Sequence, residues 1–191
     1  MEAVEALKVA NAEFETRLRA VASQHWHLPT PCPEWNVRAL VNHVLLGTRM
    51  SAHVLSGMPR DETISYLDDD MMAETDDPVA SFVDLADQMV AAFSGPGGLD
   101  GIVEHPGGDF PRGMFCGFRV ADGACHGWDL ARAIGADETL DADMVQFLWD
   151  DAQPQREMLA ATGMFGDSAS GTVGEDAPLQ VRYLDLMGRR P

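Results

Sequence analysis

The chain has 191 residues, of which 46% are hydrophobic and 23% charged, as in an ordinary globular protein, and we expect one domain spanning residues 1–191. Acidic residues outnumber basic ones by 31 to 13, and the formal net charge is −18. Because contacts with phosphate need Lys and Arg, this balance argues against nucleic-acid binding and against docking on anionic membranes.

The three cysteines, Cys32, Cys116 and Cys125, favour a reducing compartment, since their number is odd and no CxxC pair is present. No apolar run approaches the roughly 20 residues of a membrane span. The first 21 residues carry acidic side chains and a helical period, which differ from a signal peptide. We therefore expect a cytoplasmic protein that does not insert into a membrane.

The first two helices are predicted at residues 2–23 and from Val37 to about Gly57. In the first, apolar residues recur at steps of three and four: Val4, Leu7, Ala10, Phe14, Leu18 and Val21. A proline-rich loop follows it, and Asn36 is a suitable N-cap for the second helix.

Residues 61–77 are acidic and are predicted to be irregular. Asp68, Asp69 and Asp70 are consecutive and lack the spacing and the turn glycine of a calcium loop, so we interpret them as a solvated surface. Asp77 and Pro78 are typical of an N-cap and first helical position, and predict a third helix that ends before Gly95.

A glycine-rich connector is expected at 97–111, with at most a short extended piece at 102–105. A fourth helix should run from Pro111 or Arg112 to Gly135, and a fifth from about 141 to 162, where Gly163 would stop it. One short helix is predicted at 178–187. These elements predict an all-α fold, a helical bundle with short extra elements near the C-terminus.

Asp122 and His126 are the first candidate metal ligands. They are four residues apart on the predicted fourth helix, so their side chains share one face, together with Asp129, Phe115 and Phe118. Ionisable groups among Phe side chains need a partner, and a cation is one solution. An ordinary ion pair has the same spacing, so the spacing alone leaves both readings open.

His43 is the candidate third ligand, because it lies at the edge of the apolar stripe of the second helix. His53 lies about 15 Å further along that helix and turned away, so it cannot share the site. Asp129 is the candidate for orienting a ligand, or for a local cap or ion pair. Arg119 would either receive a substrate carboxylate at the rim or form an ordinary ion pair.

Two segments carry a resemblance to a known family: TPCPEWNVRALVNHV at 30–44 and ADGACHGWDLARAIG at 121–135. They resemble the DinB-like (YfiT-like) metal-binding bundles, and more narrowly the actinobacterial branch related to mycothiol-dependent maleylpyruvate isomerase. The resemblance implies a four-helix bundle with one long crossover and a metal held by His43, Asp122 and His126. The isomerase has Glu where this chain has Asp122, which is one methylene shorter.

Three protein ligands leave a position open for water or substrate, which is the pattern of catalytic zinc, and nickel, iron or manganese would also accept this set. The resemblance implies a small-molecule substrate, a low-molecular-weight thiol such as mycothiol, and a homodimer. We expect a thiol-dependent isomerase or S-transferase that acts on a small electrophile, with Arg119 and Asp129 assisting. The alternatives are a metal-dependent hydrolase with Asp129 as general base, and a non-enzymatic bundle that binds a ligand or partner.

Overall fold

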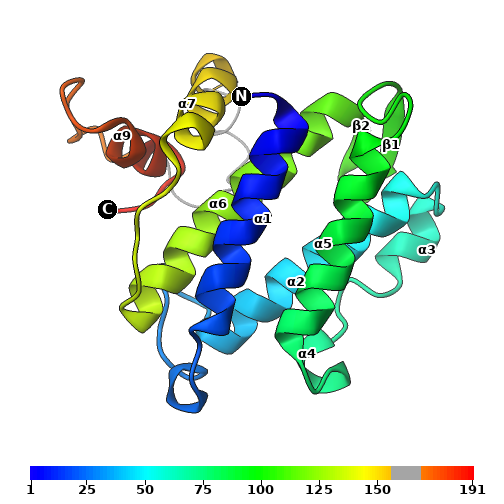
Figure 1. Ribbon diagram of the computed structural model, residues 1–191, viewed down its shortest axis with the longest axis horizontal. Helices are drawn as coiled ribbons and strands as arrows, with labels where there is room; N and C mark the ends of the chain where they lie inside the picture. The colour runs from blue at the N-terminus through cyan, green and yellow to red at the C-terminus, as the bar shows by residue number, and fades with distance from the viewer. Residues whose placement is uncertain (156–168) are drawn as a thin grey trace.

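The computed structural model describes residues 1–155 and 169–191, and most of them are helical (Figure 1). The long helices and the strands are α1 (Ala3–Arg19), α2 (Val37–Leu55), α5 (Pro78–Ser94), β1 (Ile102–His105), β2 (Gly108–Pro111) and α6 (Arg112–Ile134). The shorter elements are η1 (Ser23–His25), α3 (Arg60–Ile64), α4 (Met71–Glu74), α7 (Ala142–Ala152), η2 (Gln153–Gln155) and α9 (Leu179–Leu186).

The ends of the long helices are set by local side chains and backbone, as the sequence predicts. The Asn36 side chain accepts a hydrogen bond from the Ala39 amide at 2.9 Å and caps α2. Asp77 accepts from two amides of the first turn of α5, with Pro78 at the start of that helix. Gly135 ends α6 with a φ of 69°, a left-handed conformation that glycine adopts without a steric penalty.

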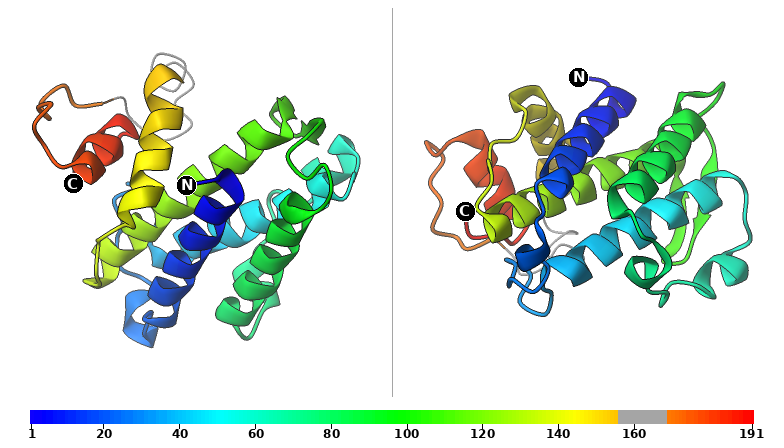
Figure 2. Two further views of the ribbon diagram at one scale, coloured as in Figure 1. Left: turned by 45° about the horizontal axis from the view of Figure 1, so that its top comes forward. Right: turned by 60° about the horizontal axis from the view of Figure 1, so that its bottom comes forward.

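The four long helices form the expected all-α bundle. Each of α1 and α2 packs against both α5 and α6 (Figure 1), and all four helices contribute to each of two buried apolar clusters. Beside this bundle, α7 and α9 pack together next to α6, at one edge of the molecule (Figure 2). Among the described residues, no helix is long and apolar enough to cross a membrane.

Three segments differ from the sequence-based predictions. The predicted helix at 141–162 is shorter, because α7 ends at Ala152 and a 3-10 turn containing Pro154 follows; proline lacks the amide that a continuing helix needs. The rest of that predicted helix lies outside the described residues. The acidic segment 61–77 contains α3 and α4, and the expected extended piece at 102–105 pairs with 108–111 as an antiparallel hairpin.

Candidate metal centre

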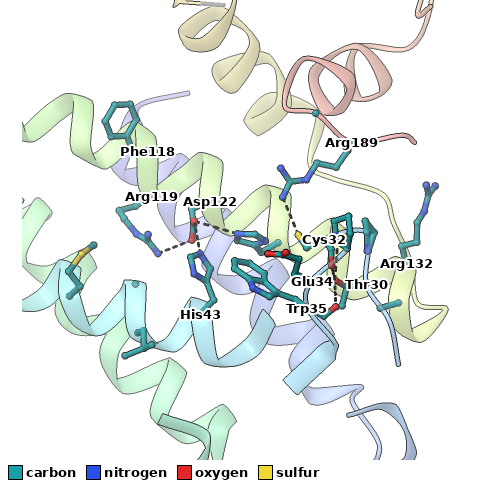
Figure 3. A pocket seen from close by; sticks show the side chains of 18 of the residues that line it. Thr30, Cys32, Glu34, Trp35, His43, Phe118, Arg119, Asp122, Arg132 and Arg189 are labelled. Atoms are coloured by element: carbon teal, nitrogen blue, oxygen red, sulfur yellow. Dashed lines mark hydrogen bonds and ion pairs between the residues drawn. The ribbon is translucent and has the colours of Figure 1, made fainter. Parts of the chain in front are cut away.

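A pocket of about 1350 Å³ lies between α2 and α6. The proline-rich loop before α2, the β1–β2 hairpin and the C-terminal residues after α9 also contribute to its walls. Figure 3 shows Asp122 and His43 facing each other inside this pocket, from α6 and α2 respectively. The i, i+4 spacing on α6 and the capped start of α2 thus place the candidate ligands at one wall.

The two candidate histidines converge on one carboxylate oxygen of the third candidate ligand, Asp122. Nε2 of His43 lies 3.5 Å from Oδ1 of Asp122, and Nε2 of His126 lies 3.6 Å from the same oxygen. These distances are longer than those of good hydrogen bonds. Around a tetrahedral zinc ion with bonds of about 2.1 Å, ligand atoms lie about 3.4 Å apart. The donor atoms therefore fit a divalent ion.

Asp122 is a mostly buried carboxylate that is held in its charged form. Burial alone would raise the pKa of Asp122, but Arg119, His126 and His43 together hold this pKa well below its usual range. Arg119 forms an ion pair with Oδ2 at 3.1 Å, and this buried oxygen accepts no hydrogen bond from any described residue. The other oxygen, Oδ1, faces the two imidazoles, and a cation held between them and this charged oxygen would give it a partner.

Arg119 lies deeper than the pocket rim at which the sequence placed it. Its side chain is only 9% exposed, and the guanidinium lies against Gly47 of α2. A Cβ at Gly47 would come within 3.1 Å of Nη1 of Arg119, so the absence of a side chain there gives the guanidinium room. The structure thus brings Arg119 into contact with a candidate ligand, as an ion pair.

Asp129 lies behind His126 and is fully buried. Its Oδ2 is 3.1 Å from Nδ1 of His126, and Arg189 donates to both carboxylate oxygens, at 2.7 and 3.3 Å. Burial would raise the pKa of Asp129, but the hydrogen bonds from His126 and Arg189 lower it below its usual value. An ionised Asp129 can only accept a hydrogen bond from Nδ1–H of His126, so in the neutral ring Nε2 carries no proton and can bind a metal.

Trp35 covers the two imidazole rings. Its ring centroid lies 4.5 Å from that of His43 and 5.6 Å from that of His126, and the two imidazoles meet edge to face at 4.9 Å. Trp35 follows the proline-rich loop, which an isolated bridge between Pro29 and Asn36 holds at the start of α2. This loop thus fixes an aromatic wall over the candidate site.

A second group of donor atoms lies beside the first: Cys32, His126 and Asp129. Sγ of Cys32 donates to Oδ2 of Asp129 at 3.4 Å. Burial and the charge of Asp129 raise the pKa of Cys32 to about 12, so this group is a thiol at neutral pH. Arg189 already supplies a positive charge to Asp129. Arg189 occupies both oxygens of Asp129, whereas Arg119 pairs with Oδ2 of Asp122 and the two imidazoles face Oδ1. The group around His43 therefore fits an ion better.

No sequence pattern places three further pocket residues: Cys32, Glu34 and Arg189. In the sequence, Arg189 is 60 residues and Cys32 is 97 residues away from Asp129. A local spacing pattern therefore predicts neither contact. Glu34, also in the proline-rich loop, lines the pocket near Cys32 (Figure 3). The structure keeps His53 apart from the site, as the sequence predicts, because its Nδ1 bonds to the Tyr66 hydroxyl.

The chain folds as a helical bundle of the DinB-like class, and His43, Asp122 and His126 form a group in it that could hold a metal ion. Residues 7–131 match the family described as "Mycothiol maleylpyruvate isomerase N-terminal domain", and the chain belongs to this family. It is similar to two proteins of Mycobacterium tuberculosis, "Uncharacterized protein MT0763" from strain CDC 1551 / Oshkosh and "Uncharacterized protein Rv0738" from strain H37Rv. Each is 29% identical over 144 residues, which cover 75% of this chain and 74% of the relative. No solved structure matches the chain.

Proposed function

We propose that this protein is a metal-dependent enzyme that presents a low-molecular-weight thiol to a small electrophile, as an isomerase or an S-transferase. The observation that carries this proposal is the convergence of both Nε2 atoms on Asp122 at the wall of a large pocket. Family membership supports the thiol, because the family description names mycothiol.

His43, Asp122 and His126 would hold the ion, and zinc suits two imidazoles and one carboxylate with a fourth position open. A bound divalent ion would lower the pKa of a thiol at that open position. The chain's own residues prepare the ligands for this task. Arg119 keeps Asp122 ionised, Asp129 keeps the proton of His126 on Nδ1, and Trp35 packs against both imidazoles.

Asp129 acts in this proposal as a positioning residue. Its carboxylate is fully buried and is held by His126, Arg189 and Cys32, so it has no free oxygen to offer to a water molecule. Glu34 is the better proton acceptor, because its exposed carboxylate lines the pocket and none of the described residues bonds to it. It would take the proton that the thiol releases.

Elemental analysis of the purified protein tests the metal centre. We expect about one divalent ion per chain in the wild type and a loss of most of it in His43→Ala and in His126→Ala. His53→Ala is the matched control, since His53 is on the same helix as His43 but bonds to Tyr66 outside the pocket. A wild-type protein without bound metal would contradict the proposal.

The same preparations test the chemistry with a panel of small electrophiles, each with and without an added thiol. We expect consumption of an electrophile only when the thiol is present, and at least a hundredfold less in His126→Ala. Turnover without thiol would favour the metal-dependent hydrolase instead.

A further inference from the structure

The pocket has two ends of different chemistry on either side of the candidate metal ligands. In Figure 3, Phe118 lies on one side of Asp122 and His43, whereas Cys32, Arg132 and Arg189 lie on the other. We call the first the aromatic end; it is lined by Leu46, Met50, His105, Phe110, Phe115 and Phe118. We call the second the arginine end; it is lined by Cys32, Glu34, Arg132, Arg189 and Arg190.

The aromatic end is a set of rings in mutual contact. The centroids of Phe110 and Phe118 are 5.4 Å apart and edge to face, and the His105 ring lies 5.5 Å from those of Phe110 and Phe115. The rings of Phe110 and Phe118 are only partly buried, so apolar surface remains for a ligand to cover. Covering it favours a flat, apolar group.

This end has little to offer a charged ligand. Arg119 lines the pocket, and its charge is already paired with Asp122. Arg60, which is not among the pocket-lining residues, donates to the His105 carbonyl and is paired with Asp109. A carboxylate buried among Phe110, Phe115 and Phe118 would lose its hydration without gaining an unpaired cation to balance its charge. A charged acceptor is therefore disfavoured here, although the arginine end could accommodate one.

His105 supplies one neutral hydrogen-bond donor. Its Nδ1 accepts a hydrogen bond from the Gly107 amide at 2.9 Å, so in the neutral ring the proton is on Nε2. Burial, together with Arg119 and Arg60, lowers the pKa of His105 and favours this neutral ring. No described residue accepts a hydrogen bond from Nε2, so a ligand can do so.

We propose that the aromatic end binds the electrophilic substrate, and that this substrate carries an uncharged, aromatic or similarly flat group with a carbonyl that accepts from His105. This inference rests on the proposed function, in which the thiol would occupy the arginine end. It names a class of acceptor: an uncharged carbonyl compound with an apolar group.

Calorimetric titration with 3-phenylpropanamide tests the inference, because this probe has an aromatic ring and a carbonyl but no charge, and a thiol does not readily attack its amide carbon. We expect it to bind the wild type, and to bind at least tenfold more weakly to Phe118→Asp, since the carboxylate would lie in the aromatic end. Met114→Asp is the matched control: it adds the same charge one turn earlier on α6, at an exposed side chain outside the pocket. It should bind like the wild type.

Two further measurements guard against a folding artefact and test the polar contact. Leu46→Asp places the charge on the facing helix α2 and should weaken binding to a similar extent, with thermal unfolding confirming that each variant folds. His105→Phe keeps an aromatic ring but removes the donor, and should weaken amide binding about tenfold, as expected when a ligand carbonyl loses its partner.

The charge preference is tested with 3-phenylpropanoate, which we expect to bind at least tenfold more weakly than the amide. The inference would be overturned if the carboxylate bound the wild type as tightly as the amide and lost this binding in Phe118→Asp. A failure of the amide to bind the wild type would overturn it as well. The amide needs neither metal nor thiol. If the purified protein contains no metal but binds the amide, only the proposed function is contradicted. If the protein contains metal but does not bind the amide, only this inference is contradicted.

Discussion

Asp129 connects the candidate metal ligand His126 to the arginine end of the pocket. It bonds to the candidate ligand His126 on one side and to Arg189 and Cys32 on the other. The Asp129 side chain is 0% exposed. Its charge needs the ion pair with Arg189, because a buried charge without a partner is costly. One carboxylate thereby fixes a histidine tautomer and anchors the C-terminal tail.

Replacement of Asp129 by Asn tests whether this carboxylate fixes the tautomer of His126. The Asn side chain has nearly the same shape but can donate to Nδ1 of His126, which would place the imidazole proton on Nε2 and block metal binding there. We expect metal affinity to fall about tenfold to a hundredfold, as for other groups that orient a metal-binding histidine. Competition with a chelator measures it, and Asp143→Asn, an exposed carboxylate on α7, is the control.

Acid unfolding of the same variant gives an independent readout. The pKa of Asp129 is lower in the folded protein than in the unfolded chain, so its contribution is present above about pH 4 and is lost as the pH falls further. Asp129→Asn removes this contribution, and its stability should decline less steeply between about pH 5 and 2. An unchanged metal affinity together with an unchanged acid slope would rule out the assigned role.

At the scale of the elements, the approach of α1 to α6 fixes the helix that carries Asp122 and His126. A Cβ added at Gly123 would lie 3.4 Å from the Cβ of Ala10, which is ordinary van der Waals contact with no room beyond it. Ala10 is fully buried. The two helices can therefore pack closely only if both positions carry small side chains.

Gly123→Val should destabilise the fold by about 1–3 kcal/mol, because the branched side chain would force α1 and α6 apart. Gly123→Ala is the matched control. Its single methyl group fits, and the better helix propensity of Ala adds up to about 1 kcal/mol, so it should be neutral or stabilising. Urea unfolding compares the two, and equal stabilities would show that the contact is not tight.

The elements that could be predicted from the sequence are those whose signals are local. Asn36, Asp77 and Gly135 each act within a few residues: the first two begin a helix and the third ends one, each where expected. Pro154 is an equally local signal for the end of α7, although the predicted helix at 141–162 continues past this proline. The β1–β2 hairpin lacks a clear alternating pattern, so only its extended first strand was visible beforehand.

The candidate site divides in the same way. The pairing of Asp122 with His126 follows from their spacing on one helix, whereas His43 needed the family resemblance to join them. The contacts of Arg189 and Cys32 with Asp129 depend on how distant segments pack, which periodicity does not encode. Local patterns thus predict the helix that carries two of the candidate ligands, and tertiary packing supplies the groups that contact them.

At the scale of the whole molecule, the net charge of −18 makes the arginine end unusual. Arg132, Arg189 and Arg190 gather at one end of the pocket and form ion pairs there with Glu138, Asp129 and Asp185. The buried pairs of Arg119 and Arg189 are shielded from solvent, whereas most of the acidic residues lie on the surface and repel one another.

Added salt should therefore stabilise this protein at pH 7. The Debye length falls from about 10 Å at 0.1 M salt to about 3 Å at 1 M, which screens repulsion between exposed carboxylates far more than attraction within the buried pairs. We expect the melting temperature to rise by several degrees when NaCl is raised from 0.1 to 1 M, as measured by circular dichroism. Sucrose at equal osmolality controls for general solvent effects. A melting temperature that falls with salt would mean that attractive ion pairs, and not surface repulsion, dominate the electrostatic free energy of the fold.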